Sequence, residues 1–322
     1  MAVTIGPGWT IGAGWILGSD PNAGPLPTQQ AIFGFGSNST APYVLSMTNK
    51  VSSTGTVSSD TPGVGTARAG LSAAGYGTDK AIFGYGNNNG FVSMTNLVSN
   101  TGVVASDTPG VGTARDNAAA AGYSSDKAIF GFGFLASGYT AVTNLVSNTG
   151  VVASDTPSVG TAKAWLAAAG YGSTGQAIFG FGADGVSGII SITNKVSNTG
   201  VVASDTPGVG TARYQLAAAG YGGDKAIFGY GWNGSTEMSM TNLVSNTGVV
   251  ASDTPGVGTA RHFLAAAGYG GDKAIFGYGS RPVPVNNTAV TNLVSNTGVI
   301  SSEQSGVGSV RQQLAAAGFS LT

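Results

Sequence analysis

The sequence predicts an all-β protein, specifically a six-bladed β-propeller of four-stranded antiparallel blades whose ring is closed by the C-terminal strand. Three observations lead to this fold. One unit of about 48 residues is repeated six times, each unit contains four short strand-like segments, and the two ends of the array each hold part of one unit. Such repeats are typical of propeller blades, whereas helical solenoids need two long amphipathic helices per repeat.

The repeat is clearest in the phrase AIFGFG or AIFGYG, which recurs every 47 to 50 residues. Its phenylalanines are Phe33, Phe83, Phe130, Phe179, Phe228 and Phe276. A Thr-Asn pair recurs in the same register, with its asparagines at Asn49, Asn96, Asn144, Asn194, Asn242 and Asn292. A basic residue also recurs, at Arg68, Arg115, Lys163, Arg213, Arg261 and Arg311.

Four strands are expected in each unit. The first is Ala-rich, because the innermost strands of six blades converge on a crowded channel that admits only small side chains. LAAAG is too short between glycines to nucleate a helix. The second, the AIF strand, supplies the bulk between blades. The third ends at an Asn-Thr-Gly turn, a hairpin signal because Asn and Gly adopt positive φ at low cost, and the fourth is the VVASD segment.

The ends of the array predict how the ring closes. The first AIF strand, at Phe33, has no Ala-rich strand before it, whereas an unpartnered Ala-rich strand begins at Leu314. We therefore expect the last strand to complete the first blade, which leaves no open edge for another chain. The chain is then divided into a leading segment, residues 1–27, and a propeller, residues 28–322.

Composition excludes several classes of function. Only 8% of the residues are charged, the net charge is −1 and no basic run is present, so a nucleic-acid partner is not expected. The absence of cysteine excludes a disulfide scaffold, a thiolate zinc site and thiol catalysis. Neither a basic leader nor an apolar stretch of about 18 residues occurs, so a signal peptide and membrane insertion are not expected.

The charged residues do not predict an active site. Most of them recur with the repeat, and we expect a structural role in which pairs such as Asp60 and Arg68 hold each return loop. His262 is the only histidine and lies in a variable pair beside Phe263, which favours a surface or ligand-facing ring over a catalytic base. No enzymatic activity, cofactor or metal is therefore expected.

The six units differ at two places, one after the AIF strand and one in the residue pair that follows the basic residue. In a four-stranded blade both places emerge on the same face, and the loops of the opposite face barely vary. Aromatic residues among Asn, Ser and Gly in exposed loops are suited to sugar stacking or protein contact. Free drift of exposed loops would also produce such variation. The predicted ligand-binding residues are Phe91, Tyr139, Trp165, Tyr214, Trp232, His262 and Phe263.

Residues 1–27 are not needed by the repeat and contain Trp9 and Trp15. A Pro- and Gly-rich stretch ends this segment and is typical of a linker. The WTIGAGWILG stretch alternates apolar and small residues as a strand would, so it is expected either to plug the ring or to add to a sheet of a partner. We favour an anchor on a larger assembly, with Trp9 and Trp15 in contact with it.

The stretch ARHFLAAAGYGGDKAIFGYG, residues 260–279, combines a basic residue, an Ala-rich strand and an aromatic strand that ends in glycines. It resembles a kelch-type repeat, and the resemblance covers about residues 28–322. It departs from kelch repeats in carrying Gly-aromatic-Gly instead of a Gly pair and in lacking a Trp after the third strand. The near-identical repeats and the WTIGAGWILG opening also resemble structural proteins of tailed phages of marine bacteria.

These resemblances imply a non-enzymatic virion component, such as a decoration, knob or fibre protein. Residues 1–27 would anchor it to other virion proteins, and its variable face would contact a host-surface glycan or protein. It would be located in the virion and reach the outside by lysis. The alternative is a carbohydrate-binding propeller, a lectin, that uses Trp165, Tyr214, Trp232 and Phe263 as stacking platforms.

Overall fold

The computed structural model of the chain describes residues 3–4, 10–11, 29–41, 43–157, 159–282 and 286–320. In these residues all regular structure is β-strand in small antiparallel sheets, which confirms the predicted all-β class. No helix there has the length and apolar character needed to cross a membrane. Within the leading segment, β1 (Val3–Thr4) pairs with β2 (Thr10–Ile11), whereas Trp9 and Trp15 lie outside the described residues.

Six three-stranded sheets contain most strands of the described chain. Each has an Ala-rich first strand, an AIF strand in the middle and a third strand with the Thr-Asn pair. The sheets are β24 (Ala315–Phe319), β3 (Gln30–Ser37), β4 (Val44–Val51); β5 (Ser72–Tyr76), β6 (Lys80–Gly84), β7 (Thr95–Val98); β8 (Ala119–Tyr123), β9 (Lys127–Gly131), β12 (Thr143–Val146); β14 (Ala167–Tyr171), β15 (Gln176–Gly180), β17 (Thr193–Val196); β18 (Ala217–Tyr221), β19 (Lys225–Trp232), β20 (Glu237–Val244); and β21 (Ala265–Tyr269), β22 (Lys273–Gly277), β23 (Thr291–Val294). Two short pairs lie beside them, β10 (Phe134–Leu135) with β11 (Gly138–Tyr139) and β13 (Lys163–Ala164) with β16 (Ala183–Asp184).

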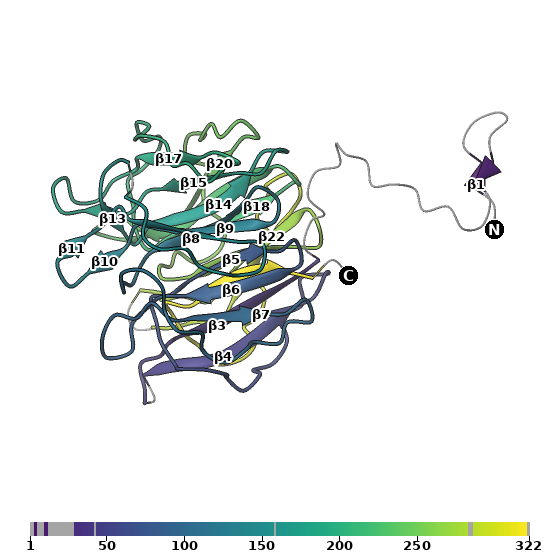
Figure 1. The fold of residues 1–322 in the computed structure, drawn as a ribbon, viewed down its shortest axis with the longest axis horizontal. Helices are drawn as coiled ribbons and strands as arrows, with labels where there is room; N and C mark the ends of the chain where they lie inside the picture. The colour runs from purple at the N-terminus through teal and green to yellow at the C-terminus, as the bar shows by residue number, and fades with distance from the viewer. Residues whose placement is uncertain are drawn as a thin grey trace.

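The sheets contact one another through their first strands. β5 contacts β8, β8 contacts β14, and the series continues through β18, β21 and β24, which contacts β5 again. Strands from both ends of the array share one sheet, because β24 pairs with β3 over five residues, from Ala315↔Gly34 to Phe319↔Gln30. The predicted pairing of the last strand with the first AIF strand is thus present. In Figure 1 the yellow end of the ribbon, which includes β24, lies among these sheets.

Each first strand carries a glycine where neighbouring first strands approach most closely. A Cβ on Gly122 would lie 3.3 Å from the carbonyl oxygen of Gly75, and a Cβ on Gly170 would lie 3.0 Å from that of Gly122. The neighbouring backbone would have to move to admit any side chain. The equivalent glycines are Gly75, Gly122, Gly170, Gly220, Gly268 and Gly318. The close approach of neighbouring first strands therefore gives a steric reason for the glycine in each of them.

The AIF strands fill the spaces between neighbouring sheets. Their Ile and Phe side chains are completely buried in all six units. Phe83 of β6 lies against Phe35 of β3, with ring centroids 5.2 Å apart. It also reaches Gly34, where a Cβ would lie only 2.7 Å from the Phe83 ring. The core is thus divided into clusters, each of which combines residues of neighbouring sheets.

The fourth segment of each unit does not form a regular strand, which corrects the predicted four-stranded blade. In the second unit it pairs with β7 only through the isolated bridges Val98↔Val104 and Thr95↔Thr108. The register shifts by one residue between these bridges. Between the two bridges, the Asn96 side chain donates to Ala105 O at 3.0 Å and to Asp107 Oδ1 at 2.9 Å. This bulge and the following Pro109, which has no N–H, end the ladder.

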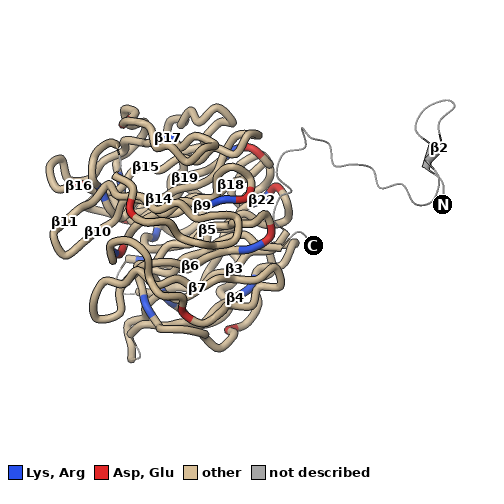
Figure 2. The backbone as a smooth tube through the Cα atoms, in the orientation of Figure 1, with Lys and Arg blue, Asp and Glu red and all other residues tan. Residues whose placement is uncertain are grey.

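The repeated basic residues pair with acids of the following unit, which corrects the expected pairing of Asp60 with Arg68. Arg68 Nη1 lies 3.9 Å from Asp107 Oδ1, whereas Asp60 Oδ1 lies 3.8 Å from Arg311 Nη1. The five arginines of this series are completely buried. Figure 2 shows how sparse the charged residues are along the chain. The charge pairs therefore join neighbouring units rather than closing loops within one unit.

The surroundings of Arg68 show how such a charge is accommodated between two sheets. Its guanidinium carbon lies 4.5 Å from the centroid of the Phe35 ring in the preceding sheet. Nη2 donates to Asn96 Oδ1 at 2.7 Å, Nε to Tyr85 O at 2.8 Å and Nη1 to Thr66 O at 3.1 Å. Burial lowers the pKa of Arg68 to about 10, so the guanidinium remains charged at neutral pH.

Lys163 takes the place of arginine in one unit and leads to a first prediction. Its ammonium group lies over the Phe132 ring and donates to Asn194 Oδ1, and burial lowers its pKa to about 8. A guanidinium is more weakly hydrated than an ammonium and can donate to several carbonyls at once. Lys163→Arg is therefore expected to stabilise the protein by about 1 kcal/mol at pH 7 in denaturant unfolding.

The pH dependence identifies the cause of this gain. The folded pKa of Lys163 lies below the ordinary value of 10.5, so the wild type becomes more stable as pH rises from about 8 to 10.5. An arginine at this place, with a pKa close to the value of about 10 for Arg68, stays charged over most of that range, so the advantage of the variant should shrink as pH rises from about 8. Arg213→Lys, the matched control, should lose stability. An advantage that is absent, or equal at pH 7 and pH 10, would contradict this explanation.

Candidate functional site

The two variable places of the repeat lie together at one end of the sheets. Isolated bridges join the first residue of a variable pair to a residue that follows the AIF strand: Ser37↔Gln312, Ala69↔Asn87, Asp116↔Phe134, Tyr214↔Trp232 and His262↔Ser280. We call this end the variable face. The opposite end, with the turns between first and second strands (residues 77–79, 124–126, 172–175, 222–224 and 270–272), is the uniform face. In Figure 1 the variable face, with β10, β11 and β13, lies on the left.

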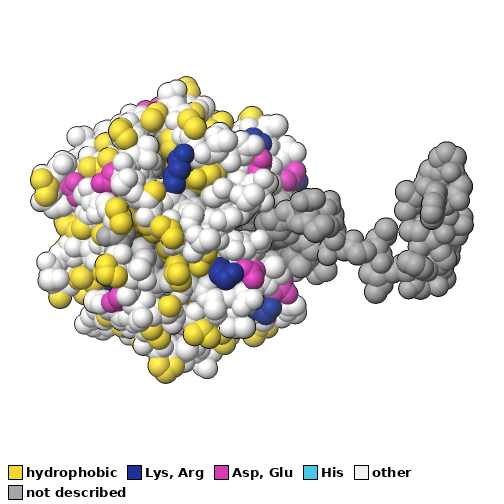
Figure 3. All heavy atoms as spheres, turned by 45° about the horizontal axis from the view of Figure 1, so that its top comes forward, with side chains coloured by type: hydrophobic (Ala, Val, Ile, Leu, Met, Phe, Trp, Pro, Cys, Tyr) yellow, Lys and Arg dark blue, Asp and Glu magenta, His cyan; other side chains and the backbone are white. Residues whose placement is uncertain are grey.

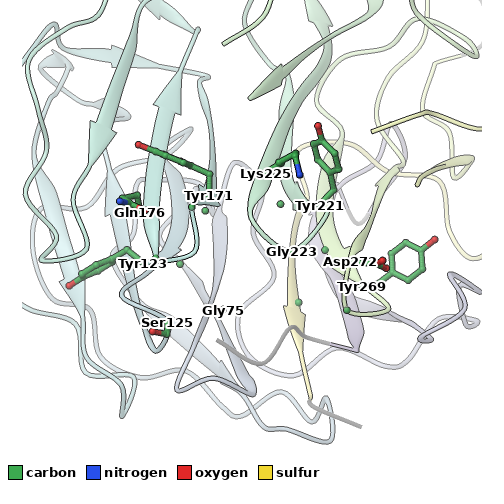
Figure 4. Close-up of a pocket in the computed structure, with 18 of the residues that line it drawn as sticks. Gly75, Tyr123, Ser125, Tyr171, Gln176, Tyr221, Gly223, Lys225, Tyr269 and Asp272 are labelled. Atoms are coloured by element: carbon green, nitrogen blue, oxygen red, sulfur yellow. The ribbon is translucent and has the colours of Figure 1, made fainter. Parts of the chain in front are cut away.

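The uniform face is built from repeated backbone contacts. Six hydrogen bonds link its turns from unit to unit: Gly77 N–H to Asp126 O, Ser124 to Gly175, Gly172 to Asp224, Gly222 to Asp272, Gly270 to Gln29 and Ser320 to Asp79. A cavity of about 260 Å³ opens here between the first strands. In Figure 4 the rings of Tyr123, Tyr171, Tyr221 and Tyr269 fan outward from it. The cavity wall is thus largely glycine backbone and repeated side chains.

The variable face has a cavity of about 100 Å³ at its centre, which we call the mouth. The second residue of each variable pair has a positive φ between 49° and 63°, and five of these residues line the mouth. Each backbone N–H donates to the carbonyl of the preceding one, and the Gly70 N–H donates to Gln313 O, which completes a cycle of six hydrogen bonds. The six residues are Gly70, Asn117, Trp165, Gln215, Phe263 and Gln313.

Five of the six residues in this cycle hold a side chain in a conformation that favours glycine. Gly70 occupies the same place in the cycle without one. For other residues this left-handed conformation costs about 1 kcal/mol each. Backbone requirements alone would therefore place glycine in every unit. The side chains of Asn117, Trp165, Gln215 and Phe263 are thus present at the mouth despite a cost to folding.

Five aromatic residues of four successive units form a cluster beside the mouth. The Trp165 ring centroid lies 5.5 Å from Phe134, 5.9 Å from Tyr139 and 6.2 Å from Tyr214. Phe91 extends the cluster and lies 6.4 Å from Phe134. All five side chains are half-buried, because they cover one another, so the rings are less exposed than the sequence predicted. The structure therefore joins Phe91, Tyr139, Trp165 and Tyr214 into one aromatic cluster.

The remaining predicted residues, Trp232, His262 and Phe263, form a second cluster. Ring centroids of Trp232 and Phe263 lie 5.0 Å and 5.1 Å from that of His262. His262 is only 8% exposed, so of the two predicted positions, a surface ring and a ligand-facing ring, the burial excludes the first. Burial lowers its pKa below 6.5, although Glu237, whose Oε1 lies 3.7 Å from Nδ1, opposes this shift. The imidazole is therefore neutral at pH 7 and packs against its aromatic neighbours.

Asp116 is a site residue that the repeat pattern did not single out. Its only sequence signal is an acid outside the repeated acidic positions. It belongs to the same variable pair as Asn117, and a Cβ on Gly70 would lie 3.5 Å from its Oδ2. Its Oδ1 is buried and has no hydrogen-bond partner among the described residues. Burial raises the pKa of Asp116 to about 6.

Asp116→Asn is predicted to stabilise the protein at pH 8. The pKa of the Asp116 carboxyl is higher in the folded protein than its ordinary value of 3.8. The neutral carboxyl is therefore compatible with folding below pH 4, and the wild type loses stability as pH rises through about 6 and the carboxyl ionises. Because the carboxyl is partly exposed, solvent reduces the full effect to about 1–2 kcal/mol. Denaturant unfolding at pH 4, 6 and 8 should show the gain appearing between pH 4 and 6. Asp79→Asn, in a half-exposed pair with Lys80, is the control and should not show this gain.

Two further findings limit the chemistry of the site. Among the described residues, no group of three or more His, Asp or Glu side chains lies close enough to hold a metal ion. Figure 3 shows few charged side chains on the visible side, with hydrophobic groups scattered among uncharged atoms.

No known family model matches the chain, and no curated protein matches it. Functional inference therefore rests on the residues themselves.

Proposed function

We propose that the six sheets are the blades of a six-bladed β-propeller and that β24 closes the ring. The contacts of β24 with both β21 and β5 support this arrangement. The hydrogen-bond cycles of the two faces also support it, because each passes once through all six units. A closed ring would hold the variable loops on a rigid support, which suits recognition.

The function that the geometry supports best is that of a non-enzymatic attachment protein, tethered by residues 1–27 and presenting its variable face. One observation carries this proposal. Gln29 lies on the uniform face, where its N–H donates to Ser320 O and its carbonyl accepts from Gly270 N–H. A tether that continues from Gln29 therefore leaves the end opposite the aromatic cluster. Anchoring through it turns the variable face outward.

The use of the repeated charges supports a non-enzymatic role. The basic residues of the repeat are buried between sheets, and acids such as Asp107 accept hydrogen bonds from the neighbouring Thr66. The Asp-Lys pairs of the uniform face are adjacent in sequence and satisfy each other, as in Asp79–Lys80 at 2.6 Å. These groups stabilise the fold, which leaves few charged side chains for acid–base chemistry.

We place this attachment protein in a virion, as a decoration, knob or fibre component whose partners are other virion proteins. This placement rests on the resemblance of the repeats and of the WTIGAGWILG stretch to phage structural proteins. Trp9 and Trp15 would supply the anchoring contacts. Light scattering after size exclusion tests the tether, on the full chain and on a chain that starts at residue 28. Association of the full chain alone supports the proposal, whereas two monomers would exclude self-assembly through residues 1–27.

A second candidate is a carbohydrate-binding propeller, and the aromatic cluster favours it. Half-buried rings around Trp165 combine apolar faces with polar edges, which suits stacking against sugars. A saccharide array tests this candidate with the full chain and with Tyr139→Ala and Tyr214→Ala. Binding that the wild type shows and both variants lose supports a lectin. An array without any bound saccharide would refute it and leave the attachment role to a protein ligand.

A further inference from the structure

The mouth of the variable face combines two kinds of side chain around a small cavity. Amide residues alternate with aromatic ones in the hydrogen-bond cycle, in the order Asn117, Trp165, Gln215, Phe263 and Gln313, and Gly70 leaves one side open. No lysine or arginine lines the cavity within the described chain. The Gln215 Oε1 is buried and finds no hydrogen-bond partner among the described residues. The mouth is therefore lined by aromatic residues and by a glutamine whose amide oxygen has no partner.

Two independent features indicate that these side chains serve a ligand. They occupy left-handed backbone positions that Gly70 fills without a side chain, so the fold does not require them. In addition, a buried polar atom without a partner is unfavourable unless another molecule supplies the missing hydrogen bond. Strain and an unsatisfied polar group coincide here, at the centre of the variable face.

We propose that the mouth binds the terminal sugar residue of a neutral glycan. Hydroxyl groups of the sugar would donate to Gln215 Oε1 and exchange hydrogen bonds with the Asn117 amide, while the apolar face of its ring lies against Trp165 or Phe263. This inference rests on the lectin candidate and locates its binding site. It differs from that candidate because the specific contacts come from the mouth rather than from Tyr139 and Tyr214.

The size and charge of the mouth define the ligand further. A cavity of about 100 Å³ is smaller than the sites that enclose drug-sized ligands, so it admits part of one sugar residue and leaves the rest of the glycan outside. Asp116 lies beside Gly70 at the edge of the mouth. A sialic or uronic acid would therefore meet a carboxyl group without a basic residue to pair with. Neutral sugars fit this environment.

The test replaces individual side chains of the mouth by glycine and measures the effect on binding. Full-length wild type is first applied to an array of neutral and acidic saccharides, and the affinity for the strongest neutral hit is measured by calorimetry. Gln215→Gly and Phe263→Gly are expected to weaken binding at least tenfold. The melting temperature of Gln215→Gly should change little or rise, because Gly70 shows that the cycle accepts glycine, whereas Phe263→Gly also removes the ring that packs against His262. Lys80→Ala, which removes a half-exposed partner of Asp79 on the uniform face, is the control and should bind within twofold of wild type.

The other outcomes distinguish failure of this inference from failure of the functions above. If the glycine variants bind as wild type while Tyr139→Ala or Tyr214→Ala does not, the lectin function stands and the mouth is refuted as its site. A preference for acidic saccharides would also overturn the inference. If no saccharide binds, both the inference and the lectin candidate fail, whereas the tethered attachment role is judged separately by light scattering.

Discussion

Deletion of residues 314–322 is expected to abolish cooperative unfolding of the whole protein. This deletion removes β24, which pairs with β3 and contacts both β21 and β5. Leu314 and Phe319 are 5% and 0% exposed, and burial of each contributes about 1.5–3 kcal/mol. Two sheet interfaces and a five-residue ladder are lost with them. The total approaches the 5–15 kcal/mol that stabilises a typical domain.

A rearranged chain provides the matched control for this deletion. Gln29 N lies 2.9 Å from Ser320 O, so a short Gly-Ser linker can join residue 320 to residue 29. A chain in which residues 311–320 precede residue 29 through this linker should unfold cooperatively, as the wild type does. Circular dichroism and calorimetry measure both variants. A deletion variant that melts cooperatively within a few degrees of wild type would refute closure by the C-terminal strand.

The strands could be predicted from sequence because their constraints are local and repeated. Alanine and glycine in the first strand and Ile and Phe in the second occur in every unit, and the Asn-Thr-Gly turn occurs in five units, with Ser53-Thr54-Gly55 in the first. The copies therefore report the same environment. The fourth segment could not be judged in this way. Its ladder is interrupted by the Asn96 side chain, and an asparagine in a strand-like segment does not reveal whether its amide points outward or replaces a backbone partner.

The repeat itself hides the contacts between units. Asp60 and Asp107 stand in nearly identical surroundings, so the sequence cannot show which of them pairs with Arg68. Only the packing of sheets decides that the following unit supplies the acid. The burial of His262 could not be predicted for a similar reason, because Trp232, which packs against it, precedes it by 30 residues. The sequence could thus assign the variable positions to one face, but it could not predict how deeply their side chains are buried.

Arg213→Ala is expected to destabilise the protein by about 3–5 kcal/mol, because it removes a buried charge from its partners. The guanidinium is completely buried and lies 4.3 Å from the centroid of the Phe181 ring. It donates to Asn242 Oδ1 at 2.6 Å and to Tyr230 O at 2.8 Å. Alanine leaves both acceptors without this donor and leaves a cavity between two sheets.

The contrast with an exposed cation makes the prediction specific. Lys225 is half-exposed and pairs with Asp224 at 3.1 Å, so Lys225→Ala should cost less than about 1 kcal/mol. Arg213→Met separates packing from hydrogen bonding, because it fills much of the space without supplying a donor. We expect its stability in denaturant unfolding to fall between those of Arg213→Ala and wild type. If Arg213→Ala costs no more than Lys225→Ala, the buried arginines do not hold the sheets together, and the repeat preserves them for another reason.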